Sequence, residues 1–123
     1  MQNNTLLEVL PKIGAATGDR TWPLPLDEDF KEANHSPVAD VRNSGAPEFK
    51  AWAIAAACFL QEFVKNARWA HLDIAGTAHD GPGISYLGKG ATGAGIRLLV
   101  EFVMNYQKYL KTATFKEAAQ ATS

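Results

Sequence analysis

Three long segments of the chain repeat apolar residues every three or four positions, which is typical of amphipathic helices. The first covers residues 5–17 and stops at Gly18. Pro11 lies inside it, so this helix is either kinked or begins late. The other two segments cover residues 48–66 and 95–110. The pattern therefore predicts helices near the start, in the middle and toward the end of the chain.

Shorter stretches complete the predicted elements. A short helix is predicted over residues 29–33, with Asp27 as its cap. Residues 68–75 ("RWAHLDIA") change to a short apolar run typical of a buried strand, and residues 38–41 could form a second extended piece. A strand covered by helices is the arrangement of an α/β layer, but two strands make only a marginal sheet. The pattern thus predicts an α/β fold with an incomplete sheet.

Composition and charge exclude several classes of protein. The net charge is −1 and no block of like charges occurs, so neither a nucleic-acid partner nor an anionic membrane surface is expected. No apolar run approaches the roughly 20 residues of a membrane span, and the polar start does not resemble a signal peptide. We therefore expect a cytoplasmic protein. The single cysteine, Cys58, has apolar neighbours and is expected to be buried and unreactive.

A glycine cluster precedes the last predicted helix and fits the pattern G-x-G-x-x-G at Gly88, Gly90 and Gly93. In dinucleotide-binding folds such glycines follow a strand directly, whereas here the predicted strand ends well before them. We interpret them as positions that need positive φ angles or close packing. A modest anion site formed by the amides of residues 93–95, with Lys89 nearby, remains an alternative.

A few side chains could bind a metal ion. His71 and Asp73 alternate along the predicted strand, and His79 follows in the next loop, so they could converge as ligands. Their spacing matches no known zinc motif, and a His–Asp pair on a strand is more often a buried hydrogen-bonded pair. We predict no metal ligand in this chain, with a site at these three residues as the alternative.

The most specific segments resemble a known family. "WAHLDIAGTA" (69–78), followed by "KGATGAGIRLLVEF" (89–102), strongly resembles the C-terminal end of the leucyl aminopeptidase family, the two-metal cytosolic aminopeptidases. Three upstream segments fit the same family in order: "GDRTWPLPL" (18–26), "SPVADVRNSG" (36–45) and "AAACFLQEFV" (55–64). The likeness covers residues 3–106.

The resemblance implies a fold and a domain boundary. It implies an α/β fold in which a partial three-layer sheet has flanking helices, as at the C-terminal end of an aminopeptidase catalytic domain. Residues 1–110 would belong to this catalytic-domain segment. Residues 111–123 are expected to be a weakly ordered tail or a short helix.

The resemblance also implies a function, for which this chain lacks the metal-binding signature. Family members release N-terminal residues from peptides with two divalent ions, Zn or Mn, that activate a water and polarise the scissile carbonyl. The signature N-T-D-A-E-G-R-L, which supplies two metal ligands and an Arg, is absent from this chain. The chain is therefore expected to hold no catalytic residue, no metal ligand and no cofactor, and to be inactive alone. What remains is a wall of the substrate pocket at Ala75 and Ala78, which the K-G-x-T-G segment would brace.

Such a fragment is expected to leave apolar surface and a strand edge exposed. We therefore expect either a homo-oligomer or a complementing N-terminal half as partner, with a peptide as the substrate of the complete enzyme. The alternative is a non-catalytic interaction or small-ligand-binding module that keeps the pocket around Ala75 and Ala78.

Overall fold

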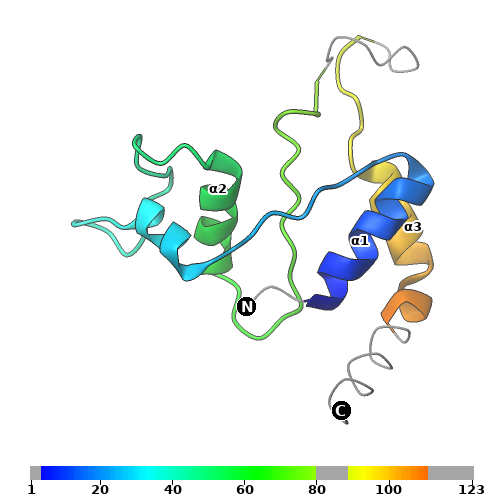
Figure 1. The fold of residues 1–123 in the computed structure, drawn as a ribbon, viewed down its shortest axis with the longest axis horizontal. Helices are drawn as coiled ribbons and strands as arrows, with labels where there is room; N and C mark the ends of the chain where they lie inside the picture. Colours follow the sequence, from blue (N-terminus) through cyan, green and yellow to red (C-terminus); the bar gives the residue numbers. More distant parts are fainter. Residues whose placement is uncertain (1–3, 80–88, 111–123) are drawn as a thin grey trace. The chain divides into compact units, whose positions relative to one another are not determined.

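The computed structural model describes residues 4–79 and 89–110. Its helices are α1 (Asn4–Thr17), the 3-10 helix η1 (Glu28–Asn34), α2 (Trp52–Gln61) and α3 (Ile96–Met104) (Figure 1). The chain divides into two units. The first combines the described residues up to Trp22 with those from Ile74 onward, and the second runs from Pro23 to Asp73.

In the first unit, α1 and α3 lie side by side (Figure 1). Ile13 of α1 and Leu98 of α3 are almost completely buried. The other buried apolar side chains of this unit are Leu6, Val9, Leu10 and Leu110. Gly14 allows a close approach here, because a Cβ at this position would lie 2.4 Å from the backbone oxygen of Asp19 and 3.3 Å from Leu98 Cδ1. Helices α1 and α3 thus share one small core.

The predicted first helix is confirmed, but it does not begin late at Pro11. Helix α1 runs without interruption from Asn4 to Thr17 with Pro11 inside it. Proline has no N–H to donate, so α1 tolerates the loss of one backbone hydrogen bond. Gly18 follows with a φ of 85°, a left-handed conformation that commonly ends helices and that glycine adopts without strain.

In the second unit, η1 packs against α2. Its core consists of small side chains, namely Ala33, Ala46, Ala55, Ala57 and Cys58. Backbone bonds tie the following loop to η1, since Arg42 N donates to Asn34 O and Ala46 N donates to Ala33 O, at 2.7 and 2.8 Å. Burial raises the pKa of the Cys58 thiol. The expectation of a buried cysteine is confirmed.

The predicted sheet is wrong for the residues that the structure describes. They contain no strand, and only a single antiparallel bridge joins His79 to Ala91. Most of residues 68–75 have no regular structure, and residues 38–41 form bends. A strand persists only when a neighbour pairs with its N–H and C=O groups. Neither segment has such a neighbour here, so the partial three-layer sheet is not formed.

Helix α2 is shorter than the pattern predicted. Instead of residues 48–66, it covers Trp52–Gln61. A turn precedes it, in which Phe49 N donates to Ala46 O at 2.9 Å. At its end Glu62 N and Phe63 N donate to carbonyls three residues earlier, so the last turn tightens and stops. The apolar pattern thus extends beyond the hydrogen-bonded helix.

The predicted end of the last helix and the predicted cap of the short helix also need correction. The last helix is not continuous over residues 95–110, because α3 ends at Met104 and Asn105 forms a turn before residues 106–110 resume helical structure. Asp27 does precede η1, but its side chain makes no capping hydrogen bond. Its carbonyl instead accepts from Phe30 N at 3.1 Å. The predicted tail over 111–123 lies outside the described residues.

Candidate functional site

Ala75 and Ala78, the predicted pocket residues, lie on one turn. This turn follows Ile74, the residue at which the chain returns to the first unit. The N–H groups of Thr77 and Ala78 both donate to Ile74 O, at 2.9 and 2.8 Å. The side chain of Ala75 is exposed and that of Ala78 is half-buried. The turn therefore brings the two small side chains into a single bend of the chain, three positions apart.

Thr92 fastens this turn to the glycine-rich segment. Its N–H donates to Ala78 O at 3.0 Å, and its hydroxyl donates to Thr77 O. The same hydroxyl accepts from Ala94 N at 3.2 Å. The bridge between His79 and Ala91 continues the contact. These bonds, the Thr92 clip, agree with the interpretation that the K-G-x-T-G segment supports the loop.

The glycines of this segment have a conformational role. Gly90 and Gly93 have φ angles of 107° and 68°. Side-chain-bearing residues rarely adopt such angles, because Cβ then crowds the backbone. The interpretation of these glycines as positions that need positive φ angles is confirmed for Gly90 and Gly93, and Gly88 lies outside the described residues.

The N-terminus of α3 is capped by an acid that sequence reasoning missed. Asp19 Oδ2 accepts from Leu98 N at 3.1 Å, and its Oδ1 accepts from Arg97 Nη2 and Nε at 2.7 and 3.2 Å. A negative charge at a helix N-terminus is favoured by the helix dipole. Asp19 already provides that charge, and Ala94 N is taken by Thr92. The alternative of an anion site here is therefore not supported.

The protonation state of Asp19 follows from these contacts. Its side chain is only 6% exposed. Burial raises the pKa of this carboxyl, but the hydrogen bonds from Arg97 and from Leu98 N–H outweigh burial and hold the pKa below its usual value of 3.8. Asp19 is therefore ionised near neutral pH. The one sequence signal for it is its place directly after the glycine that ends α1.

The alternative metal site is not formed. Among residues 4–79 and 89–110, no group of three or more His, Cys, Asp or Glu side chains could hold a metal ion. His71 and Asp73 belong to the second unit, whereas His79 belongs to the first. The described side chains thus do not fit a pair of divalent ions.

The Thr92 clip gives a first prediction. In Thr92→Val the hydroxyl bonds to Thr77 O and Ala94 N are lost, while the backbone bond to Ala78 stays. We expect faster amide hydrogen exchange over residues 77–79 and 92–94, with a local cost of about 1 kcal/mol, and unchanged exchange in α1. Thr92→Ser, which keeps the hydroxyl, is the control. Equal exchange in the two variants would show that the hydroxyl does not hold the turn.

Most of the chain matches one known protein family. The family described as "Cytosol aminopeptidase family, catalytic domain" matches residues 1–100 of the chain. The chain belongs to the cytosol aminopeptidase family. The resemblance found in the sequence is thereby confirmed, and Ala75, Ala78 and Thr92 all lie within the matched range.

Several relatives in this family carry the name "Probable cytosol aminopeptidase". A protein from Geobacter sulfurreducens is 52% identical over 98 residues, which is 80% of this chain and 19% of the relative. One from Pseudomonas fluorescens is 47% identical over 106 residues, 86% of this chain and 20% of the relative. The chain spans about a fifth of the length of these cytosol aminopeptidases. In the part of the chain that the structure describes, no helix is long and apolar enough to cross a membrane.

Proposed function

We propose that this chain is the C-terminal part of a cytosol-aminopeptidase catalytic domain, that it supplies a wall of the substrate pocket, and that it does not hydrolyse peptides alone. One observation carries the proposal. The chain matches its relatives over most of its own length but over only about a fifth of theirs, and the signature N-T-D-A-E-G-R-L occurs nowhere in it. In this proposal the two divalent ions of the complete enzyme are held by residues outside this chain.

The proposed role of the chain rests on the turn that carries Ala75 and Ala78. Methyl side chains leave room for the first side chain of a peptide, and they offer it an apolar contact. The Thr92 clip holds the turn from the side of α3, so it would fix the position of this wall. The names of the relatives support a cytoplasmic location for the complete enzyme.

The exposed apolar side chains of α3 support the proposal that a partner binds this helix. Five apolar side chains of this helix are 46–78% exposed: Ile96, Leu99, Val100, Val103 and Met104. Their spacing places them along one stripe, which in a surface helix normally faces a core. A contiguous exposed apolar patch of this kind marks an interaction surface. We assign it to a polypeptide that carries the metal-binding remainder of the same catalytic domain.

The proposal is tested with the purified chain and leucine 4-nitroanilide in the presence of Mn²⁺ or Zn²⁺. We expect no turnover above that of the metal ions alone. Adding the segment of the Geobacter sulfurreducens relative that lies outside the matched region is expected to produce metal-dependent turnover. Metal-dependent turnover by this chain without a partner would overturn the proposal.

A pair of variants tests the assigned surface. Val103→Lys places a charge on the exposed stripe, whereas Asn43→Lys adds the same charge at an exposed polar position outside this helix. We expect Val103→Lys to lose complementation and Asn43→Lys to keep it, with both variants folded by circular dichroism. Equal complementation by the two, or a dimer of this chain that Val103→Lys dissociates, would contradict the assignment.

A further inference from the structure

Helix α2 is apolar on all sides, and this pattern does not suit a helix at the surface of a protein. Gln61 is the only polar residue of the helix. A helix that is hydrophobic all round is normally buried, either in the core of a large protein or in a membrane. With 10 residues α2 is too short to cross a membrane, which takes about 20 residues. Its composition therefore predicts a helix that is covered on every side.

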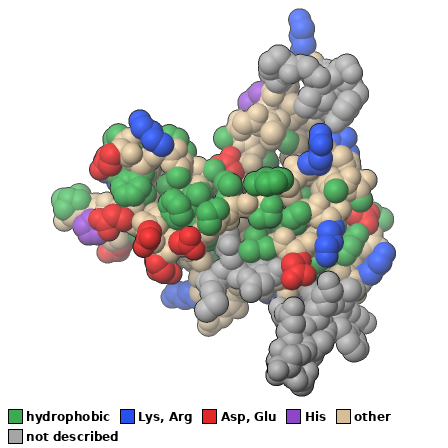
Figure 2. All heavy atoms as spheres, in the orientation of Figure 1, with side chains coloured by type: hydrophobic (Ala, Val, Ile, Leu, Met, Phe, Trp, Pro, Cys, Tyr) green, Lys and Arg blue, Asp and Glu red, His purple; other side chains and the backbone are tan. Residues whose placement is uncertain are grey.

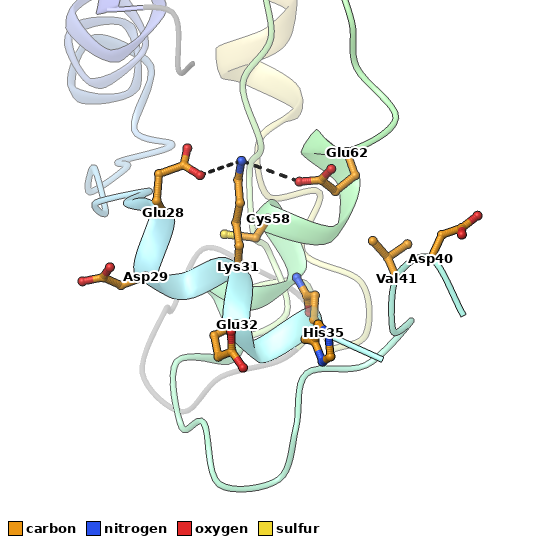
Figure 3. A pocket seen from close by; sticks show the side chains of 10 residues that line it. Glu28, Asp29, Lys31, Glu32, His35, Asp40, Val41, Cys58 and Glu62 are labelled. Carbon is orange, nitrogen blue, oxygen red and sulfur yellow. Dashed lines mark ion pairs between the residues drawn. The ribbon is translucent and has the colours of Figure 1, made fainter. Parts of the chain in front are cut away.

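One side of α2 is covered within the second unit. The buried residues of the helix are Ala55, Ala57 and Cys58. Here η1 packs against α2, and Asn34 Nδ2 of η1 donates to Ala55 O at 2.8 Å. Lys31 Nζ, also of η1, lies 3.7 Å from an oxygen of Glu62, the residue that follows α2 (Figure 3). This side of α2 thus already has its partner in η1.

The other side of α2 is exposed. Trp52, Ala56, Leu60 and Phe63 follow one another at helical spacing and line one stripe, which we call the outer face of α2. Trp52, Leu60 and Phe63 are 54%, 42% and 66% exposed, and Ala56 is also exposed. The Phe63 ring packs edge-on against Phe59, with 5.3 Å between the ring centroids. Figure 2 shows hydrophobic side chains gathered over α2. Such a contiguous apolar surface marks an interaction site.

We propose that the outer face of α2 binds the metal-binding remainder of the catalytic domain; this docking rests on the proposed function and adds a contact to the one assigned to α3. The lengths of the relatives support this occupant. The family match includes all of α2, and the matched region is only about a fifth of each relative. The segment that corresponds to α2 therefore belongs to a much longer chain, whose remaining part can cover the second side of the helix.

Lysine side chains flank the outer face of α2 at both ends. Lys50 lies two residues before Trp52, and Lys65 lies two residues after Phe63. Both are exposed, and within the described part of the chain neither forms an ion pair. An apolar stripe with cations at its ends fits a partner surface that has an apolar centre and carboxylates at its rim. We expect the remainder to present such a surface to α2.

The test is co-expression of this chain with the tagged remainder of the Geobacter sulfurreducens relative, so that the two parts fold together. We expect the wild-type chain to copurify with the remainder and to give metal-dependent turnover of leucine 4-nitroanilide. Ala56→Lys places a charge in the middle of the outer face. It is expected to reduce the copurified amount about tenfold or more, because an unpaired ammonium is costly to bury.

Two further variants keep this test specific. Lysine forms helices nearly as well as alanine, so α2 is expected to persist in Ala56→Lys, and circular dichroism of the chain alone checks this. If Ala56→Lys unfolds, Phe63→Lys, beyond the end of the helix, decides in the same way. Ala39→Lys makes the same chemical change at an exposed position of the same unit outside α2 and is expected to copurify like the wild-type chain.

The outcomes separate this docking surface from the proposed function. Equal copurification of Ala56→Lys and Ala39→Lys, with turnover restored by the wild-type chain, would reject the outer face of α2 and leave the proposed function intact. Failure of the wild-type chain to copurify or to restore turnover would reject both. A dimer of this chain that persists in the copurified complex and that Ala56→Lys dissociates would assign the outer face to a second copy and overturn the proposal.

Discussion

Leu98→Ala is expected to lower the free energy of unfolding of the first unit by about 2–5 kcal/mol. Leu98 is 0% exposed and lies where α3 meets α1. Truncation removes buried apolar surface and leaves a cavity that two short helices fill poorly. Because small domains are stable by about 5–15 kcal/mol, this is a large share of the total. Urea denaturation and hydrogen exchange in α1 and α3 measure the effect.

Leu99→Ala is the matched control for this prediction. It makes the same chemical change on the next residue of the same helix, where the side chain is 46% exposed. We expect a much smaller loss of stability, below about 1 kcal/mol. If the two variants lower the free energy of unfolding equally, the packing of α1 on α3 is not what stabilises the first unit.

Asp19→Asn is expected to destabilise the first unit at pH 7 by about 1–2 kcal/mol. The substitution removes the charge that pairs with Arg97 and that caps α3. The effect depends on pH because the pKa of Asp19 is lowered in the folded state. A lowered pKa means that the stabilisation is fully present above the usual value of 3.8 and is lost as the pH falls through the folded-state pKa.

Stability measurements at pH 7, 5 and 3 check this second prediction. The difference between the wild-type chain and Asp19→Asn is expected to be equal at pH 7 and 5 and to shrink at pH 3. Asp27→Asn, at a helix N-cap whose side chain makes no capping bond, is the control and is expected to cost little at any pH. A difference that does not shrink in acid would show that charge is not the cause.

The fold was predictable wherever the elements depend on local pattern. The spacing of apolar residues identified α1, α2 and α3, and Gly18 marked where α1 ends. The strand at residues 68–75 was not predictable in the same way. Its apolar run is real, but a strand also needs a paired neighbour, and the described residues supply none. The predicted ends of α2 and α3 were wrong because the turns at which these helices end cannot be recognised from the spacing of apolar residues.

The candidate site, too, was predictable only in part. Ala75 and Ala78 follow from the family resemblance and stay a prediction as pocket residues, whereas the bonds from Thr92 to the turn that carries them are present in the structure. Asp19 was missed because its role arises from a contact with Arg97, 78 positions away in the sequence. The hydrogen bond from Asn34 to Ala55 spans 21 positions and has no motif. Residues whose function depends on distant neighbours look like ordinary polar residues in the sequence.

The arrangement of the first unit has a consequence for synthesis on the ribosome. Its two parts come from opposite sides of the second unit in the chain, so α1 leaves the ribosome long before α3 exists. At a translation rate of about 5–20 residues per second, the 78 positions between Asp19 and Arg97 correspond to a delay of about 4–16 s. During that time the apolar face of α1 has no partner, whereas the contiguous second unit can already fold. The core that α1 shares with α3 can thus form only after residues 23–73 have been synthesised.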